Sequence, residues 1–209
     1  GDADMRDADA RDFQMELTTV RQAMESWTST EDSNTLRDRN MAENVESVRK
    51  IEAEIGSGKI VISAHDGHIE RVNPIYTNMG VLLSQNFGND YYAIGTDVWK
   101  LRDNIKTMGE AKRSIQSFVS GDPLAAQARF AEGQQYVLYF SELTEEESPV
   151  YSLVRKPMRM MQLGEGYSFL MRLLPDQTYR LKGIPNEHYD AMLFLYEAHP
   201  IEVLETPGA

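Results

Sequence analysis

The sequence predicts an α/β fold, with a mostly parallel sheet of about four strands flanked by helices and preceded by an N-terminal pair of helices. Two observations predict it. Apolar residues recur at helical spacing over the first 55 residues, and from residue 59 helical segments alternate with short, uninterrupted apolar runs. Such runs are typical of strands buried on both faces, and their alternation with helices favours parallel strands joined by helical crossovers.

Two helices open the chain. The first has an apolar stripe in steps of four and three residues, formed by Phe13, Leu17, Val20, Met24 and Trp27. The second is predicted over residues 35–55, with Ser33 or Asn34 as its N-cap. Gly56 should end it, because glycine commonly follows the last turn of a helix.

Four runs rich in apolar residues are predicted to be the strands, at residues 59–64, 91–96, 135–140 and 191–196. Further helices are expected over residues 74–87 and 123–132, the second with Asp122 as its cap and Pro123 in its first turn. The chain shows no internal repeat and no linker. We therefore expect a helical segment over residues 1–34 and one α/β part over residues 35–209.

Composition excludes several functional classes. The chain has 209 residues and a net charge of −12, so a nucleic-acid partner is not expected, because such binding depends on Lys and Arg neutralising phosphates. No apolar run approaches the roughly 20 residues of a membrane span, and no signal segment opens the chain. The absence of Cys excludes disulfides and Cys nucleophiles and leaves the cellular compartment undecided.

Two of the four histidines, His65 and His68, flank Asp66-Gly67 directly after the first apolar run. Ligands bind beyond the carboxyl ends of strands in open α/β sheets, and an imidazole there can act as a general base near neutral pH. The alternative is that His65 is a buried, hydrogen-bonded core residue and Asp66-Gly67 an ordinary turn.

We expect neither a metal nor a cofactor. The loop offers ring nitrogens and a carboxylate, but a metal site needs a further protein ligand. The Gly-containing segments Gly56-Ser57-Gly58-Lys59 and Gly164-Glu165-Gly166 lack the spacing of a phosphate-binding loop. Four methionines between residues 158 and 171 are interpreted as flexible core filler rather than as part of a cofactor site.

Arg37 lies on the second predicted helix, next to Asp38 and one turn before Met41. Helical spacing continues to Asn44, so Arg37 and Asn44 can reach the region that this helix packs against. A guanidinium there could bind a carboxylate or a developing oxyanion. The alternative is a solvated helical face.

These residues resemble a known family. Residues 37–44, Arg-Asp-Arg-Asn-Met-Ala-Glu-Asn, are similar to the Arg-Asp-x-x-Met-Ala-x-Asn motif of the erythromycin esterase-like family, which includes proteins named for succinoglycan biosynthesis. Residues 60–69 resemble that family's hydrophobic strand followed by Ala-His-Asn-x-His-Val. Met79-Gly80 and the segment 88–95 continue the pattern, more loosely followed to about residue 198.

The resemblance implies hydrolysis of a carboxylic ester, such as a macrolide lactone, by water activated through histidine and carboxylate groups. It implies that His65 lies in the cleft, and Arg37 and His68 match further motif positions. As a hydrolase, the chain would use His65 to orient or protonate the reacting carbonyl and Arg37 to stabilise the oxyanion, and the general base would come from a missing segment or from a second chain. Asp66 stands where the family usually has Asn.

The family's Gly-Glu-x-x-His-Gly segment has no counterpart before Arg37. The chain therefore resembles the C-terminal portion of such a protein, with an incomplete active site. The expected partner is a small ester or lactone if the chain is active, and self-association or a missing N-terminal half if an apolar seam is left uncovered. The alternative function is a non-catalytic relative that binds a ligand or a protein.

Overall fold

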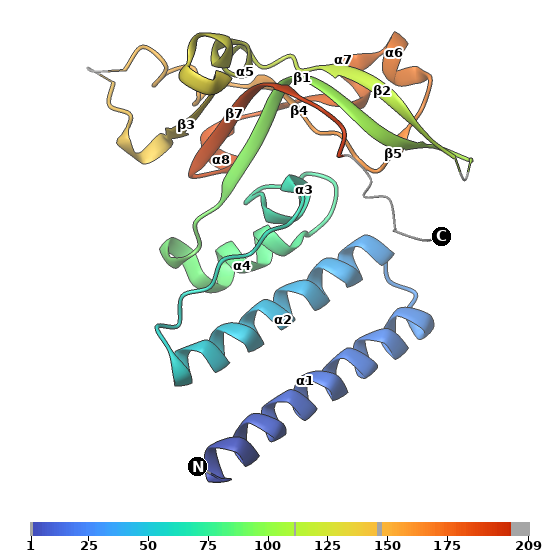
Figure 1. Cartoon of the computed structure of the whole chain (residues 1–209), viewed down its shortest axis with the longest axis vertical. Coiled ribbons are helices and arrows are strands. Elements are labelled where there is room, and N and C mark those ends of the chain that lie inside the picture. Colours follow the sequence, from blue (N-terminus) through green and yellow to red (C-terminus); the bar gives the residue numbers. More distant parts are fainter. Residues whose placement is uncertain (1, 111, 146–147, 202–209) are drawn as a thin grey trace, which may run out of the picture. The chain divides into compact units, whose positions relative to one another are not determined.

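The computed structural model describes residues 2–110, 112–145 and 148–201, and their contacts divide the chain into two compact units (Figure 1). Residues 1–91 form the first unit and residues 92–209 the second. The first unit contains α1 (Asp2–Thr28), α2 (Ser33–Ile55), α3 (Asp66–Ile69), α4 (Met79–Phe87) and the 3-10 helix η1 (Gly88–Asp90).

The N-terminal helical pair is confirmed. In Figure 1, α1 and α2 run side by side and are joined by a short loop. The N-cap of α2 is Asp32, whose carboxylate accepts a hydrogen bond from Thr35 N–H at 2.9 Å, so the choice of Ser33 or Asn34 is wrong by one or two residues. Gly56 ends α2 as predicted, and its N–H donates to Glu52 O at 2.7 Å.

The strand predicted at residues 59–64 is wrong. This segment has no ladder partner, and Val61 is fully exposed. An extended apolar run becomes a strand only when a neighbouring strand completes its backbone hydrogen bonds. The described residues of the first unit supply no such neighbour.

The helix predicted over residues 74–87 is shorter in the structure and begins at Met79. The residues before it form a turn, in which Asn73 Oδ1 accepts hydrogen bonds from the N–H groups of Ile75 and Tyr76. Asn78 caps α4 by accepting from Val81 N–H at 2.8 Å. An asparagine that caps its own following backbone commonly marks such a helix start.

The second unit contains β1 (Ile94–Thr107), β2 (Arg113–Val119), α5 (Pro123–Gln127), η2 (Ala128–Phe130), η3 (Glu132–Gln134), β3 (Gln135–Tyr139), η4 (Phe140–Glu142), β4 (Met158–Met161), β5 (Gly166–Tyr167), α6 (Leu170–Leu173), α7 (Pro175–Thr178), β6 (Arg180–Gly183), α8 (Pro185–His188) and β7 (Ala191–Ala198). Three of the predicted strands are thus present, β1 in a longer form. The helix predicted over residues 123–132 ends at residue 127 and continues as a 3-10 turn.

The class is α/β, but the main sheet is mixed rather than mostly parallel. Its order is β2-β1-β7-β3, with β5 beside β1. The central β1–β7 pair is parallel and the β1–β5 contact spans only two residues, whereas β1–β2 and β3–β7 are antiparallel. A tight connection through Gly109, at φ +82°, makes β1 and β2 a hairpin, which can only be antiparallel. A second, two-stranded sheet pairs β4 with β6.

The core of the second unit forms around β1, β2 and β7. Phe194 on β7 is fully buried and lies against the ring of Tyr136, with the ring centroids 5.1 Å apart. Ile105 and Phe118 pack with Tyr179, and partly buried methionines cover this cluster. Met158 and Met160 are buried as well, which supports their interpretation as core filler.

Candidate functional site

The loop that carries the two histidines forms the one-turn helix α3 in the first unit. His65 is its N-cap: the backbone is extended at this residue, and the ring Nδ1 accepts a hydrogen bond from Gly67 N–H at 3.1 Å. The imidazole is exposed. The interpretation of His65 as a buried core residue is therefore wrong.

His68 lies one turn further along α3 and is half-buried. Its ring is 6.3 Å from that of His65 between centroids, in an edge-on arrangement with an interplanar angle of 73°. Because α3 is helical, residues three apart project from the same side of it, so both imidazoles are presented together.

Asp38 contacts the ring of His68 from the buried side. Its side chain is fully buried, and Oδ1 lies 2.8 Å from His68 Nδ1. The same oxygen accepts a hydrogen bond from Met79 N–H, at the first turn of α4, at 2.9 Å. A buried carboxylate is stable when donors of this kind replace its water, and here two separate elements supply them.

Arg37 reaches the other nitrogen of the same ring. Its terminal NH2 lies 3.3 Å from His68 Nε2, while 56% of the side chain remains exposed. Successive residues on a helix differ by about 100° in direction, so Asp38 can be buried while Arg37 stays at the surface. The result is a continuous chain of groups, Asp38–His68–Arg37, that runs from the interior of the first unit to solvent.

Asn78 and Gly80 fix α3 against α4. Asn78 is fully buried, and its amide Nδ2 donates to Gly67 O at 2.8 Å and to Glu70 O at 3.3 Å. A β-carbon on Gly80 would lie only 2.4 Å from backbone atoms of Ile69 and Glu70. The Met79-Gly80 pair therefore has a physical role, since only glycine allows the two helices to approach so closely.

Tyr76 adds a weaker contact to the buried carboxylate. Its hydroxyl lies 3.5 Å from Asp38 Oδ2. Burial, and then the negative charge of Asp38, raise the pKa of the Tyr76 hydroxyl above its ordinary value. The phenol thus stays protonated and remains a hydrogen-bond donor toward Asp38.

Of the three residues selected from the sequence, the structure brings Arg37 and His68 into contact and places His65 beside them. Asp38 is not one of these three residues, although its position next to Arg37 in the motif is a signal in the sequence that it belongs to the same site. The sequence analysis did not identify Tyr76 or Asn78. Tyr76 contacts Asp38, 38 positions earlier, and Asn78 binds the backbone of residues 67 and 70, and no spacing in the sequence indicates these contacts.

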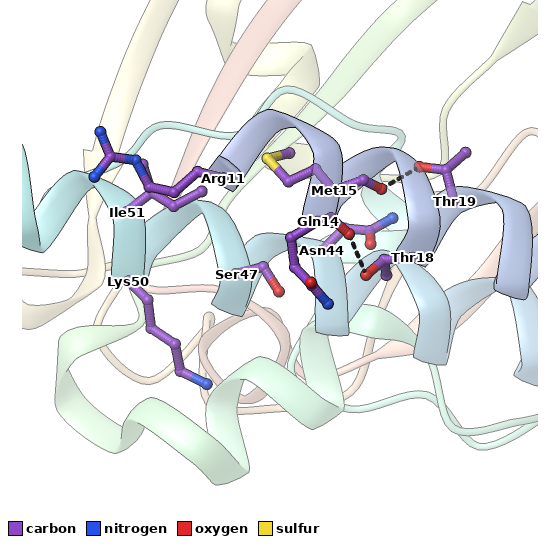
Figure 2. Close-up of a pocket in the computed structure, with 9 residues that line it drawn as sticks. All are labelled: Arg11, Gln14, Met15, Thr18, Thr19, Asn44, Ser47, Lys50 and Ile51. Atoms are coloured by element: carbon purple, nitrogen blue, oxygen red, sulfur yellow. Dashed lines mark hydrogen bonds between the residues drawn. The ribbon is translucent and has the colours of Figure 1, made fainter. Parts of the chain in front are cut away.

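A separate hollow of about 300 Å³ lies between α1 and α2 (Figure 2). None of the groups described above lines it. Its walls are Arg11, Gln14, Met15, Thr18, Thr19, Asn44, Ser47, Lys50 and Ile51. Both threonine hydroxyls in these walls already donate a hydrogen bond, Thr18 to the carbonyl of Gln14 and Thr19 to the carbonyl of Met15, each four residues earlier.

The second unit contains a buried pair of carboxyl groups, Asp97 on β1 and Asp122 at the N-cap of α5. Asp97 accepts from Met161 N–H at 2.9 Å and Asp122 from Leu124 N–H at 2.7 Å. Burial raises the pKa of Asp97 well above its ordinary value, and the charge of Asp122 adds to this. Burial also raises the pKa of Asp122 to about 6, while hydrogen bonds from the backbone N–H groups of Leu124 and Ala125 oppose the rise.

Within the ranges that the structure describes, no three His, Cys, Asp or Glu side chains are grouped so as to hold a metal ion. Across those same residues, every helix is too short or too polar to cross a bilayer.

Comparison with known proteins places these motifs in context. A family model described as erythromycin esterase matches residues 2–198. No curated protein matches the sequence. Among solved structures, a Bacillus cereus protein is similar with a TM-score of 0.61 and 18% identity, over 83% of this chain and 40% of that one.

Two further structures are similar. A succinoglycan biosynthesis protein has a TM-score of 0.60 and 13% identity, over 80% of this chain and 39% of its own. A mutant of the erythromycin esterase EreC in its open conformation has a TM-score of 0.45 and 14% identity, over 88% of this chain and 41% of that one. The chain thus spans about two fifths of the length of these solved structures.

Proposed function

The chain belongs to the erythromycin esterase family, and from this premise we propose that it contributes the Asp38–His68–Arg37 group to the hydrolysis of carboxylic esters or lactones. The observation that carries the proposal is the contact of one imidazole with a buried carboxylate on one side and a guanidinium on the other. Family membership supplies the reaction class, and the contacts support the roles of the individual residues.

Asp38 sets the tautomer of His68. A carboxylate can only accept, so His68 Nδ1, 2.8 Å away, carries the hydrogen. The lone pair of the neutral ring is then on Nε2, where the N–H of Arg37 donates to it. His68 is thereby held as a base whose accepting nitrogen points toward the exposed side of the group.

In the proposed reaction, His68 Nε2 takes a proton from a water molecule, which attacks the ester carbonyl. Asp38 stabilises the imidazolium that forms, and Arg37 turns from the ring to the oxyanion of the tetrahedral intermediate. Collapse of the intermediate breaks the carbon–oxygen bond of the ester. The imidazolium then returns its proton to the departing alkoxide, which leaves an acid and an alcohol.

His65 has a supporting role in this proposal. Its Nδ1 accepts from Gly67 N–H, so in the neutral ring the donor is Nε2–H. With the two rings 6.3 Å apart, this donor can hydrogen-bond the carbonyl oxygen of a substrate placed over His68. We assign His65 to polarising that carbonyl.

The test is hydrolysis of a panel of simple aryl esters and macrolides by the wild type and by the His68→Ala, His65→Ala and His199→Ala variants. Removal of a general base should lower kcat by about 10²- to 10⁴-fold for His68→Ala. His199 is exposed in the second unit and serves as the matched control, with no expected loss. A wild type no faster than His68→Ala would reject the hydrolase proposal and favour a non-catalytic, ligand-binding relative.

A further inference from the structure

The helix α1 turns its polar side, not its apolar side, toward α2. Gln22 is buried in this contact and exchanges two hydrogen bonds with the amide of Asn44, at 3.0 and 3.1 Å. Arg21 pairs with Glu43 on α2 at 2.9 Å. The partner that α1 finds within its own unit therefore does not cover its apolar side chains.

The apolar stripe of α1 is left in solvent. The exposed fractions are 60% for Phe13, 47% for Leu17, 57% for Val20, 60% for Met24 and 86% for Trp27. Single exposed apolar residues need no explanation, but five in one continuous row form a patch of the kind that marks an interaction surface. We call these five residues the α1 stripe.

The spacing of the α1 stripe identifies the shape of its partner. Steps of four, three, four and three residues are the a and d positions of a heptad repeat, which is the pattern of one helix packed along another. In the described part of the chain, the other helices of eight or more residues, α2 and α4, expose no comparable row. The helix that matches the α1 stripe is α1 itself.

We propose that two copies of this chain associate through their α1 stripes as an antiparallel helix pair. In that arrangement each a residue faces a d residue of the second copy, and the layers pair Phe13 with Met24, Leu17 with Val20, and Trp27 with Ala10. Large side chains thus meet smaller ones at the ends and similar ones in the centre. A parallel pair would instead place each Trp27 against another Trp27.

Charge favours the same orientation. Residues 9–16 carry three acidic side chains and one arginine, so parallel helices would bring two acidic segments together, whereas antiparallel helices keep them at opposite ends. A parallel pair could align Glu16 with Arg21 of the second copy, but Arg21 already binds Glu43 and Glu25 within its own chain. This proposal does not depend on the proposed hydrolase function.

The first experiment measures the association of the full chain by sedimentation equilibrium over a wide range of concentrations. The wild type should reach the dimer mass. Leu17→Glu should raise the dissociation constant at least about a hundredfold, because each dimer loses two buried leucines and gains two buried charges. Thr19→Glu adds the same charge on the same helix away from the α1 stripe and should leave the constant within about threefold.

Circular dichroism shows whether Leu17→Glu keeps its helices, which is expected because Leu17 makes no enclosed contact in the single chain. The proposal is overturned if the wild type remains monomeric at the highest concentration, or if Thr19→Glu weakens the dimer as much as Leu17→Glu. A monomer of this kind would leave the α1 stripe to a different protein segment.

The second experiment reads the orientation, and the absence of Cys makes it direct. Leu17 faces Val20 of the second copy in the antiparallel pair, so the double variant Leu17→Cys/Val20→Cys should form an intermolecular disulfide under mild oxidation. The Leu17→Cys single variant should not, because its two sulfurs are then about a helical turn apart. Efficient crosslinking of the single variant would contradict the antiparallel arrangement.

Discussion

His68 Nδ1 lies 2.8 Å from Asp38 Oδ1, so a half-buried imidazole is held against a carboxylate that has no exposed surface. These residues come from α3 and α2, which are 30 positions apart in sequence. The same carboxylate oxygen also receives Met79 N–H from α4. Three helices therefore meet at one oxygen atom.

Asp38→Asn should keep the hydrogen bond to His68 but remove the charge beside its ring. Oδ1 accepts from both His68 Nδ1 and Met79 N–H, so the amide oxygen takes this position and the amide N–H₂ group replaces Oδ2, on the side of the Tyr76 hydroxyl. A neutral amide does not stabilise the imidazolium that forms in the reaction, so kcat for ester hydrolysis should fall about 10²- to 10³-fold. The ¹⁵N shifts of the His68 ring should show an unchanged Nδ1–H tautomer, which separates the loss of charge from a loss of the contact. An unchanged kcat would contradict the assigned role of Asp38.

Asn78→Ala should destabilise the first unit by about 2–4 kcal/mol. The change removes a helix cap and also the amide that donates to the carbonyls of Gly67 and Glu70. Asn78→Ser can still cap Val81 N–H but is too short to bridge to α3, so its stability should lie between the wild type and Ala. Urea unfolding measures all three, and equal stability of the Ala variant and the wild type would refute this account.

Gly80→Ala should cost about 1–3 kcal/mol, because its β-carbon would overlap backbone atoms of Ile69 and Glu70 that cannot move without separating α3 from α4. Gly67→Ala, in the same unit, is the matched control. Its β-carbon would lie 3.4 Å from the nearest atom, His65 Nδ1, which is ordinary contact. A smaller loss of unfolding free energy for Gly80→Ala than for Gly67→Ala would show that the close approach is not important.

The stability of the second unit should fall as pH rises through about 6. The pKa of Asp122 is about 6 in the folded chain against 3.8 for an ordinary Asp, and burial raises the pKa of Asp97 as well. The folded state therefore holds protons that the unfolded state releases, so the stabilisation from Asp122 is complete below about pH 4 and is lost as the pH rises through about 6. A shift of about two units for Asp122 corresponds to about 3 kcal/mol.

Asp97→Asn tests the origin of this pH dependence. The amide can still accept from Met161 N–H, and the substitution removes one of the two buried carboxyl groups whose charges disfavour each other. We expect the variant to be more stable than the wild type at pH 8 by about 1–3 kcal/mol, and similar to it at pH 4. Equilibrium unfolding of both chains between pH 4 and 8 measures the difference. Parallel curves for the two chains would rule out the carboxyl pair as the cause.

The helical pair and the C-terminal end of α2 could be predicted from local signals. Cap residues and glycines act within a few residues of the position they determine, so Gly56 marked the end of α2. The strand predicted at residues 59–64 is wrong because a strand forms only beside a neighbouring strand, which local sequence does not reveal. The polar second half of β1 was missed for the opposite reason: its pairing with β2 and β7 overrides a composition that is not typical of strands.

The candidate site could be predicted in its members but not in its connections. The motifs marked Arg37 and His68, and the structure brings their side chains to 3.3 Å. That Asp38 is the buried partner depends on which face of α2 meets α3 and α4, and this is decided by packing across 30 to 41 positions of sequence. The motif places Arg37 and Asp38 next to each other on one helix, but their spacing does not indicate which of the two side chains is buried.

α3 is a single turn of four residues, too short to be stable alone in water, and both imidazoles are attached to it or to its cap. Its shape is borrowed from Asn78, Gly80 and Asp38 on neighbouring helices. Grafting the His65–His68 tetrapeptide onto another scaffold would therefore transfer the two histidines without the conformation and contacts on which their chemistry depends. The smallest segment that could be transferred with the histidine arrangement intact is the whole segment from α2 to α4.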